Sequence, residues 1–380
     1  MKLADVPTPA LILDQARLRR NIARMADAVK RNGVTLRPHL KTAKSIDVAQ
    51  LALVGQPGGI AVSTLREAEY FAQNGVRDIQ YAAGIVPDKL DRVVELQKTG
   101  ARITLITDNI CIARAIRERG VALNSPFHVL VEIDTGEERA GVFAQSDELV
   151  AIARVLHESA GSRLAGVMTH AGHSYRCRTI EEVAKIAEDE RSGVVTAAER
   201  LRAEGLPCET ISVGSTPTGL HARDLTGVTE VRAGVYMFGD MFQAQICSCG
   251  VNDLAVSVMA EVTGHRAEYN RLLVDAGALA LSKDRSTELV PNDVWFGLVS
   301  DLNGTPYSPQ LIVSRVHQEH GQVDGEFGAP LDDLPIGTRV RVFPNHVCMT
   351  AAMYDRYYVV DSEAGSGDEV VAVWPRINGW

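Results

Sequence analysis

Residues 210–240 read TISVGSTPTGLHARDLTGVTEVRAGVYMFGD and contain two short apolar runs, each followed by a glycine turn. Thr210–Val213 and Val228–Arg232 are predicted strands, because turn residues bound both runs. The segment between them, residues 214–227, has room for about one turn of helix. Two strands joined by so short a helical connection are typical of a repeating β/α unit.

The same pattern, a short apolar run followed by a helical segment, occurs six more times toward the N-terminus. The further predicted strands are Val34–His39, Gly59–Ser63, Ile79–Ala82, Ile103–Ile106, His128–Ile133 and Leu164–Thr169. Helical patterns separate them, beginning after Asp14, with a capping box at Thr64–Glu67 and a long final helix at Ile180–Ala203. Eight strands over about 230 residues predict a parallel (β/α)8 barrel, whose usual length is ~250 residues. A doubly wound open sheet is the competing arrangement, and it is disfavoured because no Gly-x-Gly-x-x-Gly turn follows the first strand.

From about residue 250 the pattern changes to strands joined by turns. The expected strands there are Leu254–Val262, Arg271–Asp275, Leu311–Val316, Arg339–Phe343, Tyr357–Val360 and Val370–Trp374. We therefore expect an α/β protein with a barrel domain at residues 1–245 and a smaller β-rich domain at residues 246–380. The first residues are open to either domain.

Composition narrows the class of partner. The 380 residues carry 39 Lys+Arg against 48 Asp+Glu, a formal net charge of −9, so neither nucleic acid nor an anionic membrane is expected as the partner. Apolar residues make up 46% of the chain, but no apolar run reaches the ~18 residues that cross a bilayer. Six cysteines are few for this length, so we expect a reduced, cytoplasmic protein without a disulfide framework.

Glycine turns follow the last two predicted barrel strands, where this fold commonly binds phosphate. Gly214 and Gly234 allow close backbone approach, and the amides of residues 214–216 and 234–235 are candidate phosphate donors. Ser215 and Thr216 add hydroxyl groups. A simple turn is the alternative for each segment alone, but two turns at the two expected positions favour a phosphate site.

Lys41 follows the first barrel strand. A lysine that is desolvated and close to cations loses proton affinity and can form a Schiff base. Taken singly, Lys41 and Lys44 are also compatible with solvated surface lysines. A phosphate site at the same end of the barrel favours the functional interpretation, because pyridoxal phosphate needs both a lysine and a phosphate site.

The β-rich part contains a candidate metal pair, His346 and Cys348. On an extended strand, residues i and i+2 point to one side, and imidazole with thiolate suits zinc or a similar metal. Two ligands are an incomplete site, and a structural histidine beside a buried cysteine is the alternative. Cys247 and Cys249 are a rival pair that we interpret as structural. The cluster of His317, Glu319 and His320 is either a rim of the site or plain surface.

Six motifs carry a resemblance to a known family. They are RPHLKTAKS at 37–45, EIDTGEERAGV at 132–142, THAGHSY at 169–175, SVGSTPT at 212–218, TEVRAGVYMFGD at 229–240 and PNHVC at 344–348. With these motifs in this order, the chain resembles the fold-type III pyridoxal-phosphate enzymes, the alanine racemase-like group. Within that group it is most similar to the branch of D-serine dehydratases and 3-hydroxy-D-aspartate dehydratases, which is related to the D-threonine aldolases.

The resemblance implies a role for each motif. Lys41 would hold the cofactor and act as catalytic base, His170 would pack against the pyridine ring, Arg139 would lie near the phenolic oxygen and Tyr175 would line the pocket. The phosphate would be held by Gly214, Ser215, Thr216, Gly234 and Val235. His346 and Cys348 would bind a divalent metal, zinc first, with manganese, cobalt and magnesium as alternatives. Arg232 stands where racemases place an arginine near the ring nitrogen, and its role in this branch stays open.

The resemblance also implies a reaction. A lyase of this branch removes water from a D-β-hydroxy amino acid, of the D-serine or 3-hydroxy-D-aspartate type, and releases a 2-oxo acid and ammonia. Such enzymes are homodimers with the active site at the subunit interface. The residues that would face the β-substituent are not decided among His39, Lys44, Arg139, His173 and Arg178, and the threo or erythro preference stays open.

Three other functions remain as alternatives. A D-threonine-type aldolase would use the same lysine, cofactor and metal, but such aldolases tend to have Gly-Gly-Gly-Thr at the phosphate loop and His-x-Asp at the metal. A racemase would need a second base facing Lys41, for which Tyr307 or Tyr354 are candidates. A non-catalytic carrier of pyridoxal phosphate would lack a β-rich domain, which this chain is expected to have.

Overall fold

The computed structural model describes residues 1–56, 59–326, 329, 331, 333–364 and 367–380. The chain forms two compact units that alternate along the sequence. The barrel unit contains Arg24–Lys41, Ala49–Gly234 and Gly379–Trp380, and the sheet unit contains Met1–Ala23, Thr42–Val48 and Val235–Asn378. The division into domains at residue 245 stays a prediction.

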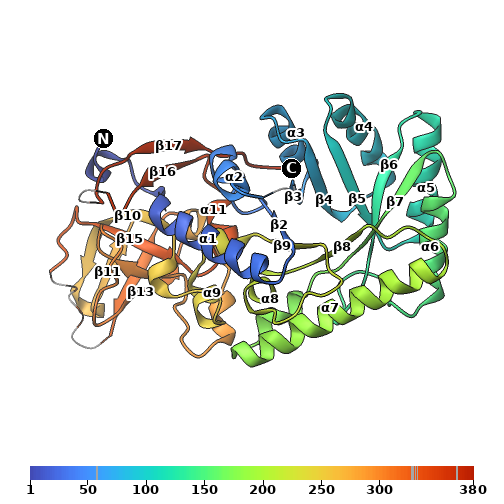
Figure 1. Cartoon of the computed structure of the whole chain (residues 1–380). Helices are drawn as coiled ribbons and strands as arrows, with labels where there is room; N and C mark the ends of the chain where they lie inside the picture. The colour runs from blue at the N-terminus through green and yellow to red at the C-terminus, as the bar shows by residue number, and fades with distance from the viewer. Residues whose placement is uncertain (57–58, 327–328, 330, 332, 365–366) are drawn as a thin grey trace. The chain divides into compact units, whose positions relative to one another are not determined.

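The barrel unit contains an eight-stranded parallel sheet (Figure 1). Its strands are β2 (Thr35–Pro38), β3 (Ile60–Val62), β4 (Asp78–Gly84), β5 (Arg102–Thr107), β6 (Phe127–Glu132), β7 (Ser162–Met168), β8 (Thr210–Val213) and β9 (Glu230–Ala233), in the order β2-β9-β8-β7-β6-β5-β4-β3. A parallel bridge between His39 and Ala61, with Leu40 N–H donating to Ala61 C=O at 2.8 Å, joins β2 to β3 and closes the ring. The predicted barrel is confirmed, and the open doubly wound sheet was the wrong alternative.

Helices alternate with the barrel strands as the periodicity predicts, with the first of them before β2 and each of the others after its strand. They are α1 (Gln15–Arg31), α2 (Ile46–Leu53), α3 (Leu65–Gln73), α4 (Leu90–Lys98), α5 (Ile110–Ala122), α6 (Asp147–His157), α7 (Ile180–Ala203) and α8 (Thr216–His221). Thr64 caps α3 through Glu67 N–H, and α8 is the short helix expected between the last two strands. Figure 1 shows α7 as the long green helix along β7 and β8. No helix within the described ranges has both the length and the apolarity to cross a bilayer.

A row of alternating charges runs through the barrel interior. Arg232 donates to the Ser212 hydroxyl, which donates to Glu230 Oε1 at 2.6 Å. Glu230 Oε2 accepts from Arg37 Nε at 2.8 Å, and Arg37 also pairs with Asp78 at 3.2 Å. Because each buried charge faces one of opposite sign, the cost of removing these groups from water is offset by pairing. We call this row the charge ladder.

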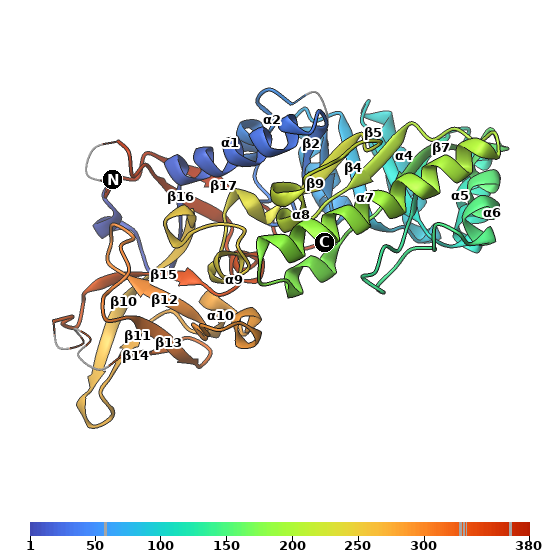
Figure 2. The ribbon, with the colours of Figure 1, turned by 60° about the horizontal axis from the view of Figure 1, so that its bottom comes forward.

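The sheet unit contains a nine-stranded sheet, with β10, β11, β13 and β14 seen together in Figure 2. Its strands are β1 (Ala10–Asp14), β10 (Val256–Arg266), β11 (Arg271–Val274), β12 (Gly297–Ser300), β13 (Leu311–Val316), β14 (Gly321–Gly325), β15 (Arg339–Pro344), β16 (Arg356–Val360) and β17 (Ala372–Pro375). The order is β11-β14-β13-β12-β15-β10-β1-β16-β17, and an additional β10–β11 pairing closes the first six strands into a ring. The sequence predicted a β-rich part here but missed β1, β12 and β14.

The strands of the sheet unit were expected to be joined by turns alone, but some of the connections contain helices. Three short helices occur there: α9 (Met241–Gln245), α10 (Ala278–Leu281) and α11 (Val347–Ala351). The first strand of the chain, β1, also belongs to this unit. It pairs antiparallel with β10 and parallel with β16, so residues from both ends of the sequence share one sheet.

Candidate active site

The loop after β2 carries Lys41. The backbone N–H of Lys41 donates to His39 Nδ1 at 3.4 Å, and His39 Nε2 lies 3.5 Å from the Ser63 hydroxyl. The Lys41 side chain is exposed, and no described residue forms a hydrogen bond or ion pair with its amine. The desolvation expected for Lys41 stays a prediction, and cations lie close to the loop. Burial, together with Lys41, Arg232 and His170, lowers the pKa of His39 well below its ordinary value.

His170 follows β7 and is a neutral imidazole. Its Nδ1 donates to the carbonyl of Gly214 at 2.8 Å, which leaves Nε2 as the acceptor. Burial lowers the pKa of His170 to about 3, and neighbouring cations add to this effect. These cations are Arg139, Lys41 and Arg232. The structure thus brings Lys41, His170 and Arg139 into electrostatic contact, as the predicted cofactor site requires.

Tyr175 and Arg139 lie on the loops near His170. Tyr175 lies in the 3-10 turn η3 (Gly172–Arg176), with its ring centroid 6.5 Å from that of His170. Arg139 is about half exposed and pairs with Glu137 at 3.2 Å. The guanidinium of Arg139 is therefore held near the loop but is open to a further ligand.

Gly214 is held from both sides by buried groups. Glu190 Oε1, on α7, accepts the N–H of Gly214 at 2.8 Å and that of Ala171 at 3.1 Å. Burial raises the pKa of Glu190, and the hydrogen bonds from Gly214 and Thr218 lower it by a smaller amount. A Cβ at position 214 would lie 2.3 Å from the Arg232 carbonyl, and the φ of +130° also favours glycine. The Gly214 amide was expected to face phosphate, but it faces Glu190.

Ser215 caps α8 and is engaged within the protein. The N–H of Ser215 donates to Thr218 Oγ1 at 3.0 Å, and the Ser215 hydroxyl accepts from Thr218 N–H at 3.2 Å. The same hydroxyl lies 2.9 Å from that of Ser174. The expected phosphate contact of the Ser215 amide is thus replaced by a capping box, while the adjoining Thr216 is buried at the first turn of the helix.

Gly234 and Val235 retain the features of a phosphate cradle. A Cβ at position 234 would lie 2.6 Å from the His39 carbonyl, so only glycine fits there. Neither amide donates to another residue in the part of the chain that is described. Free backbone N–H groups suit a phosphate, and the glycine at position 234 lets the backbone come close to it. On this observation the residues fit pyridoxal phosphate.

Arg232 is fully engaged by the protein. Its guanidinium donates to the Ser212 hydroxyl and to the Thr169 carbonyl. Burial lowers the pKa of Arg232, and the carboxylates of Glu230 and Glu190 oppose this effect. Arg232 therefore orders the residue before His170, which is a role that the sequence left open.

His346 and Cys348 do not lie on one extended strand, so that prediction was wrong. β15 ends at Pro344, His346 is the N-cap of α11, and Cys348 lies in the first turn of that helix. The helix begins there because Asp240 Oδ2 accepts the N–H of Val347 at 3.0 Å. His346 and Cys348 are nevertheless hydrogen-bonded to each other.

Asp284 orients His346. Its Oδ2 lies 2.6 Å from His346 Nδ1, and the Ser286 hydroxyl lies 3.3 Å from the same nitrogen. Burial would lower the pKa of His346, but the hydrogen bonds to Asp284 and Cys348 prevail and raise it to about 11. With Nδ1 bound to a carboxylate, Nε2 and the Cys348 sulfur remain as donors, a combination that suits a borderline divalent metal.

Among the described residues, no group of three or more His, Cys, Asp or Glu side chains is placed to hold a metal, either at His346 and Cys348 or at the rival candidates. Cys247 and Cys249, beside α9, are not part of a disulfide. His317 Nε2 lies 3.2 Å from the amide of Gln322, at an exposed hairpin between β13 and β14.

Sequence reasoning missed three buried or partly buried carboxylates that hold the site: Glu190, Asp240 and Asp284. Glu190 lies in a charged helical stretch and resembles an ordinary surface residue. Asp284 is 62 positions from His346, so no local pattern links the two. Only Asp240 carried a signal, since it ends the quoted motif TEVRAGVYMFGD.

Comparison with known proteins agrees with this geometry. The family model described as "Alanine racemase, N-terminal domain" matches residues 13–241, and that described as "Putative serine dehydratase domain" matches residues 255–360. D-threo-3-hydroxyaspartate dehydratase from Delftia sp. (strain HT23) is 44% identical over 100% of this chain and 99% of its own length. D-serine dehydratase from Dictyostelium discoideum is 30% identical over 94% of each chain. A 3-hydroxy-D-aspartate aldolase from Paracoccus denitrificans (strain Pd 1222) is 28% identical over 99% of this chain and 92% of its own.

Solved structures show the same relationship. A cysteine-to-alanine mutant of D-threo-3-hydroxyaspartate dehydratase, in a metal-free form, matches with a TM-score of 0.95 and 43% identity over 100% of both chains. An alanine racemase from Clostridium difficile 630 matches with a TM-score of 0.69 at 17% identity, over 97% of this chain and 98% of its own, which shows the shared fold. The chain belongs to the alanine racemase-like family of pyridoxal-phosphate enzymes and, within it, to the group of the D-serine and D-threo-3-hydroxyaspartate dehydratases.

Proposed function

We propose that this protein is a lyase that dehydrates a D-β-hydroxy amino acid and releases a 2-oxo acid and ammonia. The substrate class is that of D-serine and 3-hydroxy-D-aspartate, in keeping with the relatives that are 44% and 30% identical. The observation that carries the proposal is the donor pair of His346 and Cys348, with Asp284 fixing the imidazole. A Lewis acid lowers the barrier to loss of a β-hydroxyl group, whereas racemisation breaks no bond that such a metal would assist.

The barrel residues would hold pyridoxal phosphate and move the proton. When bound, this cofactor supplies an electron sink for the charge left on the α-carbon. The amine of Lys41 would hold the cofactor and, when free, would take the α-proton of the substrate. His170 presents a neutral ring whose Nδ1 is fixed by Gly214, so it does not compete for that proton. Gly234, Val235 and Thr216 offer backbone amides to the phosphate.

His346 and Cys348 would hold the divalent metal, for which zinc is our first assignment. Hydroxide is a poor leaving group, and a metal held by these residues would supply a Lewis acid that lowers the barrier to its departure. Water is lost in this step and is taken up again when the nitrogen leaves as ammonia, so the net change is conversion of the amino acid to a 2-oxo acid. A homodimer in the cytoplasm, with the active site at the subunit interface, is part of this proposal.

A panel of D-β-hydroxy amino acids, assayed for 2-oxo acid and ammonia with and without a chelator, tests the proposal. We expect 2-oxo acid from D-serine or 3-hydroxy-D-aspartate, and its loss after chelation. D-Threonine separates the related reactions, since a dehydratase yields 2-oxobutyrate and an aldolase yields glycine. Glycine as the main product would overturn the dehydratase in favour of the aldolase. If no substrate released ammonia, the remaining candidate functions would be a cofactor carrier or a racemase.

A further inference from the structure

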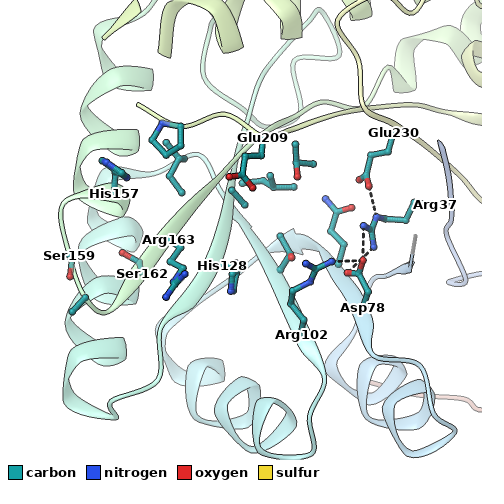
Figure 3. Close-up of a pocket in the computed structure, with 18 residues that line it drawn as sticks. Arg37, Asp78, Arg102, His128, His157, Ser159, Ser162, Arg163, Glu209 and Glu230 are labelled. Carbon is teal, nitrogen blue, oxygen red and sulfur yellow. Dashed lines mark hydrogen bonds and ion pairs between the residues drawn. The ribbon is translucent and has the colours of Figure 1, made fainter. Parts of the chain in front are cut away.

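The barrel unit contains a cavity of about 610 Å³ at the amino ends of its strands (Figure 3). Lys41, His170 and Gly214 follow the carboxyl ends of their strands, so this cavity lies at the opposite end of the barrel. Its size is within the range of roughly 300–1,000 Å³ that is typical of small-molecule sites. Nothing in the proposed reaction uses it.

One wall of the cavity consists of charges that are already paired. Figure 3 shows Arg37 between Glu230 and Asp78, the outer part of the charge ladder. Arg102 pairs with the same Asp78 carboxylate at 2.7 Å. These four side chains satisfy one another and are not free to bind a ligand by charge.

Two other charges on the lining have no partner. The side chains of Arg163, on β7, and Glu209, just before β8, form no hydrogen bond or ion pair with any residue that the structure describes. Both are exposed to the cavity mouth, and Figure 3 shows Glu209 across the cavity from Arg163 and His128. In the sheet register, His128 of β6 lies directly opposite Arg163. A cation and a neutral imidazole thus face one lone carboxylate.

The charge balance selects the kind of ligand. Arg37, Arg102 and Arg163 offset Asp78, Glu209 and Glu230, so the charged lining is neutral in sum. A neutral lining disfavours a dianion such as phosphate, and a lone cation facing a lone anion favours a molecule that carries one charge of each sign.

A buried amide is also without a partner in this wall. Gln80 is 1% exposed and lines the cavity, and neither its side-chain nitrogen nor its oxygen has a hydrogen-bond partner among the described residues. An unsatisfied buried polar group costs about 1–3 kcal/mol.

We propose that this cavity binds a small α-amino acid as its zwitterion. The α-carboxylate pairs with Arg163 and accepts from the His128 ring, and the α-ammonium group pairs with Glu209. Because the site lies at the end of the barrel opposite Lys41, a ligand bound there is out of reach of the proposed reacting amine. The proposal therefore adds a second amino-acid site to the barrel, separate from the reacting centre.

The test is isothermal titration of the holoenzyme after borohydride reduction, so that added amino acid cannot bind covalently to the cofactor. L-Serine is compared with its two halves, 3-hydroxypropanoate and ethanolamine, which keep one charge each. We expect L-serine to bind at least ten times more tightly than either half. Arg163→Gln and Glu209→Gln should each weaken L-serine binding at least tenfold, and Arg19→Gln, a change at an exposed arginine elsewhere, should not.

Three results would overturn this second site. They are no detectable binding of L-serine in the millimolar range, equal binding of 3-hydroxypropanoate, and binding that Arg163→Gln leaves unchanged. A thermal melt of each variant checks that the fold is intact. Failure of the proposed reaction would be seen separately, as a lack of 2-oxo acid from D-serine, and the titration could then be made on the protein as isolated.

Discussion

The hydroxyl of Thr42 lies 3.0 Å from the thiol of Cys348, and Thr42 is the residue that directly follows Lys41. Arg376 holds the same segment, since its guanidinium donates to the carbonyls of Thr42 and Ala43 at 3.1 and 3.3 Å. The backbone next to the predicted base is therefore fixed by a predicted metal ligand and by a buried arginine. A substitution at Cys348 should therefore shift the backbone at Thr42, and a substitution at Thr42 should shift Cys348, through this short contact.

Lys41→Gln should abolish covalent attachment of pyridoxal phosphate and lower turnover by about 10²–10⁴-fold or more, since both the bond and the base are lost. Lys44→Gln is the matched control and should keep both. Borohydride trapping followed by peptide mapping measures which lysine carries the cofactor. Label on Lys44 in the unmodified protein would contradict the assignment.

Asp284→Asn should weaken metal binding by about 10–100-fold, because the carboxylate that orients His346 Nδ1 loses its charge. Ser286→Ala removes only the longer contact of 3.3 Å and should have a smaller effect. Metal affinity measured by competition with a chromophoric chelator gives the readout without reference to turnover. An equal loss of metal affinity in Asp284→Asn and Ser286→Ala would contradict the role of the Asp284 carboxylate in orienting His346.

Acid should destabilise the protein through His170. Its pKa is about 3 in the folded state and near 6.5 when unfolded, so the unfolded chain binds a proton that the folded chain does not. Stability contributed by neutral His170 is present above pH 6.5 and falls as the pH drops, by about 2 kcal/mol between pH 7 and pH 5. His170→Asn keeps a donor to Gly214 and cannot titrate, so its urea midpoint should fall less over this range. An equal fall in both proteins would refute this linkage.

Glu230→Gln should destabilise the barrel by about 3 kcal/mol, because Arg37 and Arg232 would share no anion between them. Asp78→Asn removes a carboxylate at the more exposed end of the charge ladder and should cost less. The side chains are 9% and 23% exposed, respectively. Urea unfolding of the two variants measures the difference, and a greater loss in Asp78→Asn would reverse the order that burial implies.

Local sequence patterns predicted the barrel well because each strand is a short apolar run with a turn behind it. The missed strands β12 and β14 begin with glycine, and β14 reads GQVDG, which has only one apolar side chain to signal a strand. Their places in the sheet come from pairing with distant strands. Pairing partners of this kind leave no local trace in the sequence.

The candidate site was predicted at the level of residues but not of geometry. The pair His346 and Cys348 was found, yet their expected extended conformation was wrong because Asp240, more than a hundred positions earlier, starts a helix between them. The amides of Gly214 and Ser215 likewise found partners in Glu190 and Thr218. Hydrogen bonds between distant segments decide such details, and spacing alone does not encode them.

The pairing of β1 with β16 has a consequence for synthesis. Ile12 is made well before its parallel neighbour Tyr358, which lies more than 300 positions later in the chain. A ribosome adds about 5–20 residues per second, so β1 waits tens of seconds for this neighbour. During that delay the apolar strand Ala10–Asp14 has an unpaired edge, and a chaperone that covers such edges on nascent chains should raise the yield of native protein.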